Sequence, residues 1–383
     1  MTQNETTPLR RFKKKMKRVL IPILLATALS ACRNSIGPAE ESGAKVIDIP
    51  MLKESRTEGK PALTDIMGSI DTIRLGGTVM ESFIDHVSGV KFSSDLIFVQ
   101  SSDVLNIFDY QGNMLTTIKH KGRGPGEYIR LTAFDIIESQ RLIYILDTQS
   151  QQVIIYDFDG KHVRHFSLDC GDVVDFAVLP NGHMLLMKLL GDSNRGLYEA
   201  DENGGNIHPL YEVEPDFKRV VITSGYLIHI NDSVIGCLGQ EDTDFIYHYQ
   251  NGTLTPTYKI KTDIVISQQA RQRSSASDDP SETYFKGQYW EIERYMGLSM
   301  NNNDQFVFAM YDKDSARTTR YYKSELTEPD STIQFVPSFE YCYKGKLINA
   351  YDSGLILTVP PLHEAFPEIT EDSNPILLIF TLK

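Results

Sequence analysis

Cysteine, tryptophan and basic side chains are scarce in this chain of 383 residues. It has 4 Cys and 1 Trp, and 38 Lys and Arg stand against 51 Asp and Glu, a formal net charge of −13. No two cysteines have CxxC spacing, so zinc and thioredoxin-type redox sites lack support. The acidic balance argues against a nucleic-acid partner, for which a basic face is expected. We expect Cys170, Cys237 and Cys342 to be buried hydrophobes, with at most one disulfide among them.

Long hydrophobic runs are also few, and the first of them lies in the N-terminal segment. The run VLIPILLATAL at residues 19–29 is too short for a membrane-spanning helix, which needs roughly 20 residues. It follows a basic stretch and ends in Leu29-Ser30-Ala31-Cys32. This order predicts a lipoprotein signal peptide over residues 1–31 and acylation of Cys32. An ordinary secretory signal with a chance cysteine, or a buried apolar helix, is the alternative.

Loss of the basic residues 1–31 would leave a still more acidic chain, which anionic surfaces repel. The lipid on Cys32 would therefore have to hold the protein at the membrane, and two or three acyl chains suffice for stable attachment. Residues 32–65 are polar and rich in Gly, Pro and Ser, which predicts a flexible tether with a short extended piece at Lys45–Pro50. The expected location is the cell envelope.

Two kinds of turn recur along the rest of the chain. One kind ends in Gly112, Gly160, Gly204 and Gly252, each after a short run of alternating apolar residues. The other precedes an apolar run six times, with turns at Asp95, Arg141, Gly182, Ser233, Asp304 and Gly354. Two hairpins per unit make four strands, so residues 66–383 are predicted to form an all-β, six-bladed β-propeller of four-stranded antiparallel blades. A β-sandwich or a pair of β domains is the alternative.

The ends of the predicted propeller suggest how it closes. An N-terminal strand at Asp71–Leu75 and a C-terminal strand at Pro375–Leu382 are expected to share one blade, which hides the open sheet edges. One interval between turns is longer than the others and contains the polar residues 262–290. We interpret these residues as an insertion at the rim, with a short helix at Tyr289–Met296.

Several segments resemble a known family. Lys121–Tyr128 (KGRGPGEY) resembles the connector of NHL-type repeats, and Phe134–Phe166 is similar to an NHL unit across its length. Together with Leu29–Cys32 and the C-terminal Asp372–Lys383, they resemble the six-bladed β-propeller lipoproteins of the Bacteroides type. The resemblance implies the NHL-like propeller fold and a lipid anchor in the outer membrane, with either periplasmic or surface exposure. It implies little about chemistry.

The glycine-rich connector is the candidate ligand-binding site. Its bare backbone N–H groups and nearby positive charge could hold an anion. The candidate ligand-binding residues are Arg123, Glu127, Tyr128 and Arg130. It lacks the Lys-Ser/Thr and the helix of a P-loop. The alternative is a purely structural connector, in which Pro125 fixes φ and glycine allows close approach of two blades.

Catalytic motifs are missing from the sequence. There is no GxSxG, and His363-Glu364 does not continue as HExxH. Asp157–Gly160 lacks the further ligands of a calcium loop and is expected to be a turn. His229 and His248 could converge on a metal, but isolated strand histidines are more often satisfied by protein partners. We therefore predict no metal and no cofactor.

Two functional hypotheses follow. The favoured one is a non-enzymatic module that binds a protein, peptide or glycan at the cell envelope. The other is a propeller lyase or hydrolase with a metal or polar site in the central channel, which requires inward-facing histidines or carboxylates from several blades.

Overall fold

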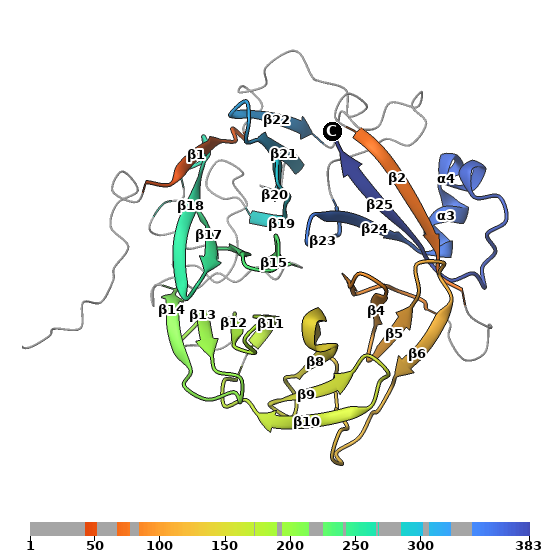
Figure 1. The fold of residues 1–383 in the computed structure, drawn as a ribbon. Helices are drawn as coiled ribbons and strands as arrows, with labels where there is room; N and C mark the ends of the chain where they lie inside the picture. Colours follow the sequence, from red (N-terminus) through yellow and green to blue (C-terminus); the bar gives the residue numbers. More distant parts are fainter. Residues whose placement is uncertain are drawn as a thin grey trace, which may run out of the picture. The chain divides into compact units, whose positions relative to one another are not determined.

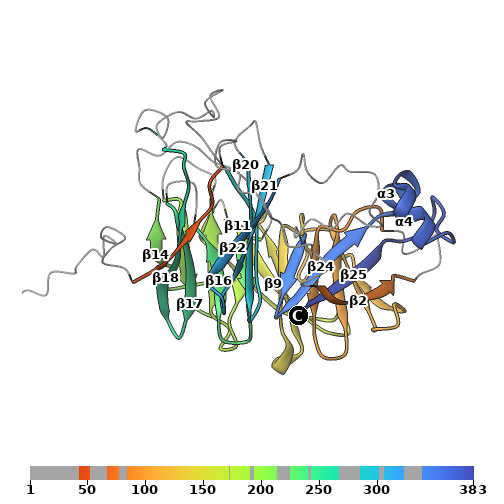
Figure 2. The ribbon, with the colours of Figure 1, turned by 90° about the horizontal axis from the view of Figure 1, so that it is seen from above.

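Six small sheets surround a common axis in the computed structural model (Figure 1). The described residues are 43–51, 67–76, 84–171, 173–189, 194–213, 225–239, 243–265, 267, 285–301, 306–322 and 339–383. Within each sheet consecutive strands pair antiparallel, which confirms the predicted all-β, six-bladed propeller with four-stranded blades. Figure 2 shows the same strands from the side.

The blades follow one another along the chain. Blade 1 contains β3 (Gly89–Phe92), β4 (Ile97–Ser101), β5 (Val104–Phe108) and β6 (Met114–Ile118). Blade 2 contains β7 (Ala133–Ile137), the 3-10 helix η2 (Glu138–Gln140), β8 (Leu142–Asp147), β9 (Gln152–Asp157) and β10 (His162–Ser167). Blade 3 contains β11 (Val173–Val178), β12 (Met184–Lys188), β13 (Gly196–Ala200) and β14 (His208–Glu212).

The remaining blades are less regular in length. Blade 4 contains β15 (Leu227–His229), β16 (Ile235–Leu238), β17 (Phe245–Gln250) and β18 (Thr253–Lys261). Blade 5 contains β19 (Phe285–Glu291), β20 (Tyr295–Asn301), β21 (Phe306–Asp312) and β22 (Arg317–Tyr322). Blade 6 contains β23 (Tyr341–Tyr343), β24 (Lys346–Tyr351), β25 (Ile376–Leu382) and the N-terminal β2 (Met67–Arg74).

The ring closes in blade 6, as predicted. Strand β2 pairs antiparallel with β25, with Ile73 opposite Leu377 and Arg74 opposite Ile376. Leu377 is fully buried. Because the two strands come from opposite ends of the chain, separating them would open the ring and expose two sheet edges.

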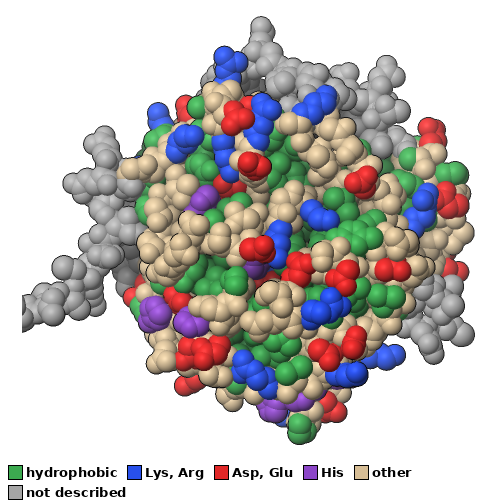
Figure 3. All heavy atoms as spheres, in the orientation of Figure 1, with side chains coloured by type: hydrophobic (Ala, Val, Ile, Leu, Met, Phe, Trp, Pro, Cys, Tyr) green, Lys and Arg blue, Asp and Glu red, His purple; other side chains and the backbone are tan. Residues whose placement is uncertain are grey.

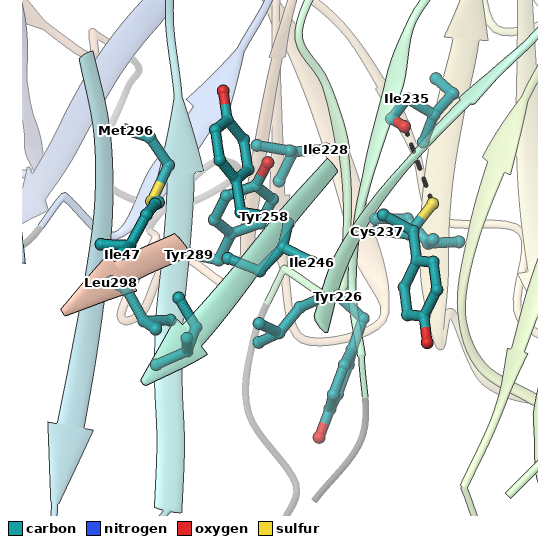
Figure 4. Close-up of a cluster of buried hydrophobic side chains, with 14 of the residues drawn as sticks. Ile47, Tyr226, Ile228, Ile235, Cys237, Ile246, Tyr258, Tyr289, Met296 and Leu298 are labelled. Carbon is teal, nitrogen blue, oxygen red and sulfur yellow. Dashed lines mark hydrogen bonds between the residues drawn. The ribbon is translucent and has the colours of Figure 1, made fainter. Parts of the chain in front are cut away.

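A second N-terminal strand, β1 (Lys45–Asp48), lies inside the predicted tether. It pairs parallel to β18 as a fifth strand at the outer edge of blade 4. Ile47, Ile49 and Met51 are buried, and Figure 4 shows Ile47 beside Met296 and Leu298 of β20. The expected extended piece at Lys45–Pro50 is therefore an ordered part of the propeller, because its alternate apolar side chains have a core to enter. Residues 1–42 and 52–66, including Leu29–Cys32, lie outside the described residues.

The predicted outer hairpin turns are confirmed in four blades. Gly112, Gly160, Gly204 and Gly252 all have positive φ, between 76° and 83°, a conformation in which a side chain would be strained. In blade 2 the Asp157 carboxylate accepts hydrogen bonds from the backbone N of Asp159 (3.0 Å) and of Lys161 (2.8 Å). Asp157–Gly160 is therefore a turn, as expected.

Two of the six inner turns were placed wrongly, although the blade count was right. Leu355–Val359 was expected to begin a strand, but α3 (Ser353–Thr358) and α4 (Pro360–Ala365) occupy this region, at the outer edge of blade 6 (Figures 1 and 2). The Asp352 side chain caps α3 by accepting from Leu355 N (2.7 Å), which starts a helix where apolarity alone suggested a strand.

The expected helix at Tyr289–Met296 is also wrong. These residues end β19, turn where Ile292 N donates to Tyr295 O (2.9 Å), and begin β20. Residues 285–290 of the predicted insertion thus belong to the inner strand of blade 5. Most of the rest of the insertion lies outside the described residues. The true inner turns of blades 5 and 6 are at residues 292–294 and 344–345, and the turn expected at Asp304 falls between β20 and β21.

The three C-terminal cysteines are free, and Cys170 and Cys237 are buried. No helix in the described part of the chain is both long and apolar enough to cross a membrane.

Replacing Leu377 by Ala should test the ring closure. The change leaves a cavity in the apolar core that blade 6 shares with blade 1, so we expect a loss of about 2–5 kcal/mol in the free energy of unfolding, measured by urea denaturation. Leu355→Ala is the matched control, because Leu355 is 39% exposed on α3, and should cost less than about 1 kcal/mol. Equal losses in the free energy of unfolding of the two variants would contradict closure of the ring through β25.

Candidate functional site

Polar side chains meet at the axis of the ring. The inner strands of five blades each carry one such residue at their third position, namely Lys91, Asp135, Asp175, His229 and Tyr343. In Figure 3 acidic and basic side chains mix at the centre of the face that points toward the viewer. The sequence analysis had singled out only His229 among them.

Asp135 is the centre of this cluster and its side chain is 0% exposed. Its carboxylate accepts from His229 Nε2 (2.6 Å) and from the backbone N of Val178 (2.7 Å), and lies 3.2 Å from Lys91 Nζ. These partners belong to blades 4, 3 and 1. One carboxylate of blade 2 therefore ties four blades together at the axis.

The pKa values of the two axial carboxylates, Asp135 and Asp175, are shifted in opposite directions. Burial alone would raise the pKa of Asp135, but the charges of His229 and Lys91 outweigh it and hold that pKa below its usual value. Asp175 accepts from Leu227 N (3.0 Å), and burial, only partly offset by Lys91, raises its pKa to about 6. Asp135 is thus a buried anion at neutral pH, whereas Asp175 loses its proton at a pH just below neutral.

Blade 6 completes the cluster through Tyr343. Its ring lies 5.3 Å from the ring of His229, and Lys91 Nζ lies 5.2 Å from its centroid. The next residue, Lys344, donates its backbone N to His229 O (2.6 Å) and so joins blade 6 directly to blade 4. The Tyr343 hydroxyl is buried and has no hydrogen-bond partner in the described part of the chain.

A pocket of about 420 Å³ opens beside this cluster, within the usual range of small-molecule sites. It lies between blades 6, 1 and 2, and we call it the mouth pocket. Its lining residues are Phe92, Ser93, Ser94, Tyr110, Glu138, Tyr343, Lys344 and Lys346. Tyr343 belongs both to the pocket and to the axial cluster.

The two lysines of the mouth pocket differ in their partners. Lys344 Nζ lies 2.6 Å from Asp232 and 3.6 Å from Glu138. Lys346 Nζ donates to the Tyr110 hydroxyl (3.1 Å) and lies 4.8 Å and 4.9 Å from the ring centroids of Phe92 and Tyr110. Among the described residues Lys346 has no carboxylate partner.

The predicted site lies elsewhere. Tyr128 is 0% exposed, and its hydroxyl donates to Asp103 O (2.7 Å) and Ile118 O (3.0 Å). The Glu127 carboxylate accepts from Gly124 N (2.7 Å) and so closes its own loop. Arg123 and Arg130 are exposed. These contacts suit the connector interpretation, and a ligand at this loop stays a prediction.

The predicted loop and the mouth pocket are at opposite ends of the blades. The mouth pocket is built from turns between first and second strands, and from Tyr110 between the third and fourth. Residues 119–132 connect β6 to β7 and are bonded to Asp103, in the turn between the second and third strands, by Lys121 (2.5 Å). Because strands alternate in direction within a blade, these two sets of loops are on different faces.

A second buried carboxylate joins blades 4 and 5. Glu291 is 1% exposed and contacts His248 Nε2 (2.9 Å), the Tyr258 hydroxyl (2.9 Å), Lys313 Nζ (2.6 Å) and the Tyr289 hydroxyl. Burial would raise its pKa, but His248 and Lys313 outweigh it and lower the pKa to about 2. His229 and His248 thus serve two separate carboxylates. No group of three or more His, Cys, Asp or Glu among the described residues is placed to hold a metal ion.

A family model described as a domain of unknown function, DUF4934, matches residues 44–381. The chain belongs to the DUF4934 family. The match includes β1 and excludes the predicted signal peptide, so the propeller of this DUF4934 protein is the family's domain. No curated protein matches the chain.

Two solved structures share the fold of this DUF4934 protein. A protein from Bacteroides fragilis NCTC 9343, named as an exported protein, has 16% identity and a TM-score of 0.69, and covers 88% of this chain and 100% of its own. A member of the DUF4221 family from Bacteroides vulgatus ATCC 8482 has 9% identity and a TM-score of 0.51, and covers 83% of this chain and 97% of its own. The expected likeness to Bacteroides propellers is confirmed for the fold, and its NHL-type and lipoprotein details stay predictions.

Asparagine substitutions of the two axial carboxylates should change stability in opposite directions at pH 7. Asp135→Asn leaves Lys91 and His229 without their anion and should cost about 3 kcal/mol or more in the free energy of unfolding. Asp175→Asn should gain up to about 3 kcal/mol, because the folded protein must ionise Asp175 against a raised pKa.

The pH dependence of unfolding distinguishes a raised pKa of Asp175 from a packing effect of the new asparagine. The pKa of Asp175 lies above its ordinary value of 3.8, so between about pH 4 and 6 the folded state binds more protons at Asp175 than the unfolded state does. The stability that this proton contributes is lost as pH rises through that range. Urea unfolding should show the advantage of Asp175→Asn growing from pH 4 to pH 7. A constant advantage would contradict the raised pKa.

Proposed function

We propose that this protein is a lipid-anchored binding protein of the cell envelope that takes up a small ligand in the mouth pocket and catalyses no reaction. The observation that carries the proposal is Lys346, a cation that lines a pocket of about 420 Å³ and has no carboxylate partner among the described residues. Ligand pockets typically combine apolar walls with a few polar or charged groups that fix the orientation of the ligand.

The envelope location rests on the sequence. The basic stretch, the apolar run and Leu29-Ser30-Ala31-Cys32 occur in the order that lipoprotein processing requires. The structurally similar B. fragilis protein is named as an exported protein, which agrees with this location. Outer-membrane attachment through Cys32 completes the proposal.

The enzyme hypothesis has one supporting observation, which is the convergence of Lys91, Asp135, Asp175 and His229 from four blades. Its weakness is that the Asp135 side chain is 0% exposed and already bonded to Lys91, His229 and Val178 N. A general base must reach a proton on the substrate. The cluster therefore favours a structural role, and the binding proposal is preferred.

A tryptophan placed at the rim should block the mouth pocket. Ser94 is exposed, and its backbone N, which the substitution keeps, donates to Glu138 (2.6 Å), so Ser94→Trp should fold normally. Thermal unfolding of the full chain in detergent would be followed with galactose, galacturonate, N-acetylglucosamine and glycylglycine. A ligand at 100 times its dissociation constant adds about 2.7 kcal/mol, which raises the melting temperature by about 3 °C.

Arg123→Trp is the matched control, since it adds the same side chain to the predicted loop on the opposite face. We expect a ligand-induced shift in the wild type and in Arg123→Trp and none in Ser94→Trp. The reverse pattern would assign the ligand to the predicted loop, and no shift with any of the four compounds would contradict a small-ligand pocket.

Cys32→Ala should abolish lipid attachment. Metabolic labelling with an alkyne fatty acid should mark the wild-type protein in the membrane fraction, because the thiol of Cys32 is the predicted acylation site. Cys170→Ala should keep the label, since Cys170 is buried. An unlabelled wild type, or a labelled Cys32→Ala variant, would contradict the anchor.

A further inference from the structure

We propose that the mouth pocket selects a sugar acid, a hydroxylated ring that carries one carboxylate, and that Lys346 binds this carboxylate. The inference rests on the proposed function and specifies the ligand class of the same pocket.

The ammonium group of Lys346 can bind an anionic ligand. An ammonium group has three donors, and among the described residues the only hydrogen bond of Lys346 Nζ is to the Tyr110 hydroxyl (3.1 Å). That hydroxyl in turn donates to Ser93 O (2.7 Å), which fixes it as an acceptor toward Lys346. Two ammonium donors are left for a ligand. The flanking rings of Phe92 and Tyr110 hold the ammonium in place by cation–π attraction.

The charge balance of the pocket favours one negative charge. Lys344 lies between two carboxylates, 2.6 Å from Asp232 and 3.6 Å from Glu138, so Lys346 is the lysine of this pocket that a ligand carboxylate can pair with. A dianion such as a phosphate would face one unpaired cation and one fixed anion. A carboxylate matches the single charge of Lys346 and forms a charge-assisted hydrogen bond with it.

The rest of the wall favours hydroxyl groups. The Glu138 carboxylate accepts from Ser94 N (2.6 Å) and retains acceptor positions, and the exposed Ser94 adds a hydroxyl at the rim. The aromatic residues Phe92, Tyr110 and Tyr343 supply apolar surface between these polar groups. Such a mixture suits a compound with several hydroxyls around a carbon ring better than a simple fatty or dicarboxylic acid.

Titration calorimetry of the full chain in detergent would test the ligand class. Galacturonate should bind, whereas galactose, which has the same ring without the carboxylate, should bind at least tenfold more weakly. Glutarate, a carboxylate without the hydroxylated ring, should also bind at least tenfold more weakly. Galactose 6-phosphate bound more tightly than galacturonate would contradict the charge match.

The role of Lys346 needs a matched pair of variants. Lys346→Met keeps the length of the side chain against Phe92 and Tyr110 and should lower galacturonate affinity at least tenfold, to the level of galactose. Lys161→Met removes the same charge from an exposed side chain that does not line the pocket, and should lower the affinity less than threefold. Equal losses of galacturonate affinity in the two variants would show that only the overall charge matters, and would overturn the assignment of Lys346.

The two proposals fail in different ways. If galactose or glutarate binds as well as galacturonate and Ser94→Trp blocks that binding, the pocket is a ligand site and only the sugar-acid assignment is wrong. If none of these compounds binds, the sugar-acid assignment is overturned, and glycylglycine or N-acetylglucosamine shifts that disappear in Ser94→Trp would still support the pocket.

Discussion

The Asp135 carboxylate is the group on which the centre of the propeller depends. It is fully buried, and its three partners outside blade 2 are a lysine, a histidine and a backbone N–H from three other blades. A buried anion without partners is very costly, so these blades must keep their inner strands within hydrogen-bonding reach of one point. The direct bond between Lys344 N and His229 O then brings blade 6 to the same axis.

This closed axis determines where a ligand can bind. Asp135, Lys91 and His229 bond one another, so a solute would have to break buried ion pairs to enter. Among the described residues, the inner turns of blades 6, 1 and 2 form the mouth pocket at one end of the axis. Tyr343 lines this pocket and is also an axial residue, so the axial network supports one wall of the pocket.

The N-terminal segment enters the ring at two places. Strand β1 extends blade 4 and β2 completes blade 6, so blade 5 lies between the two points at which the start of the chain is held. Any anchor at Cys32 would act on the propeller through β1, whose inner residues Ile47 and Ile49 are buried.

Much of the fold could be predicted from the sequence, and little of the site. The outer turns depend on a local signal, a Gly with Asp or Asn directly before it or three positions earlier, that keeps its meaning in any context. The inner turn of blade 6 was missed because Asp352 starts a helix in an apolar segment. The axial cluster escaped notice because its successive members lie 40 to 114 residues apart along the chain, and only their shared third position in the inner strands marks them. That register is visible once the strand starts are known.

The most direct test of the account is a crystal structure of the protein grown with galacturonate. We expect electron density for the sugar in the mouth pocket, with its carboxylate on Lys346 and with Asp135 still bonded to Lys91 and His229. Density for a ligand or a metal ion between Asp135 and His229 would contradict the closed axis, and with it the assignment of this protein as a binding module.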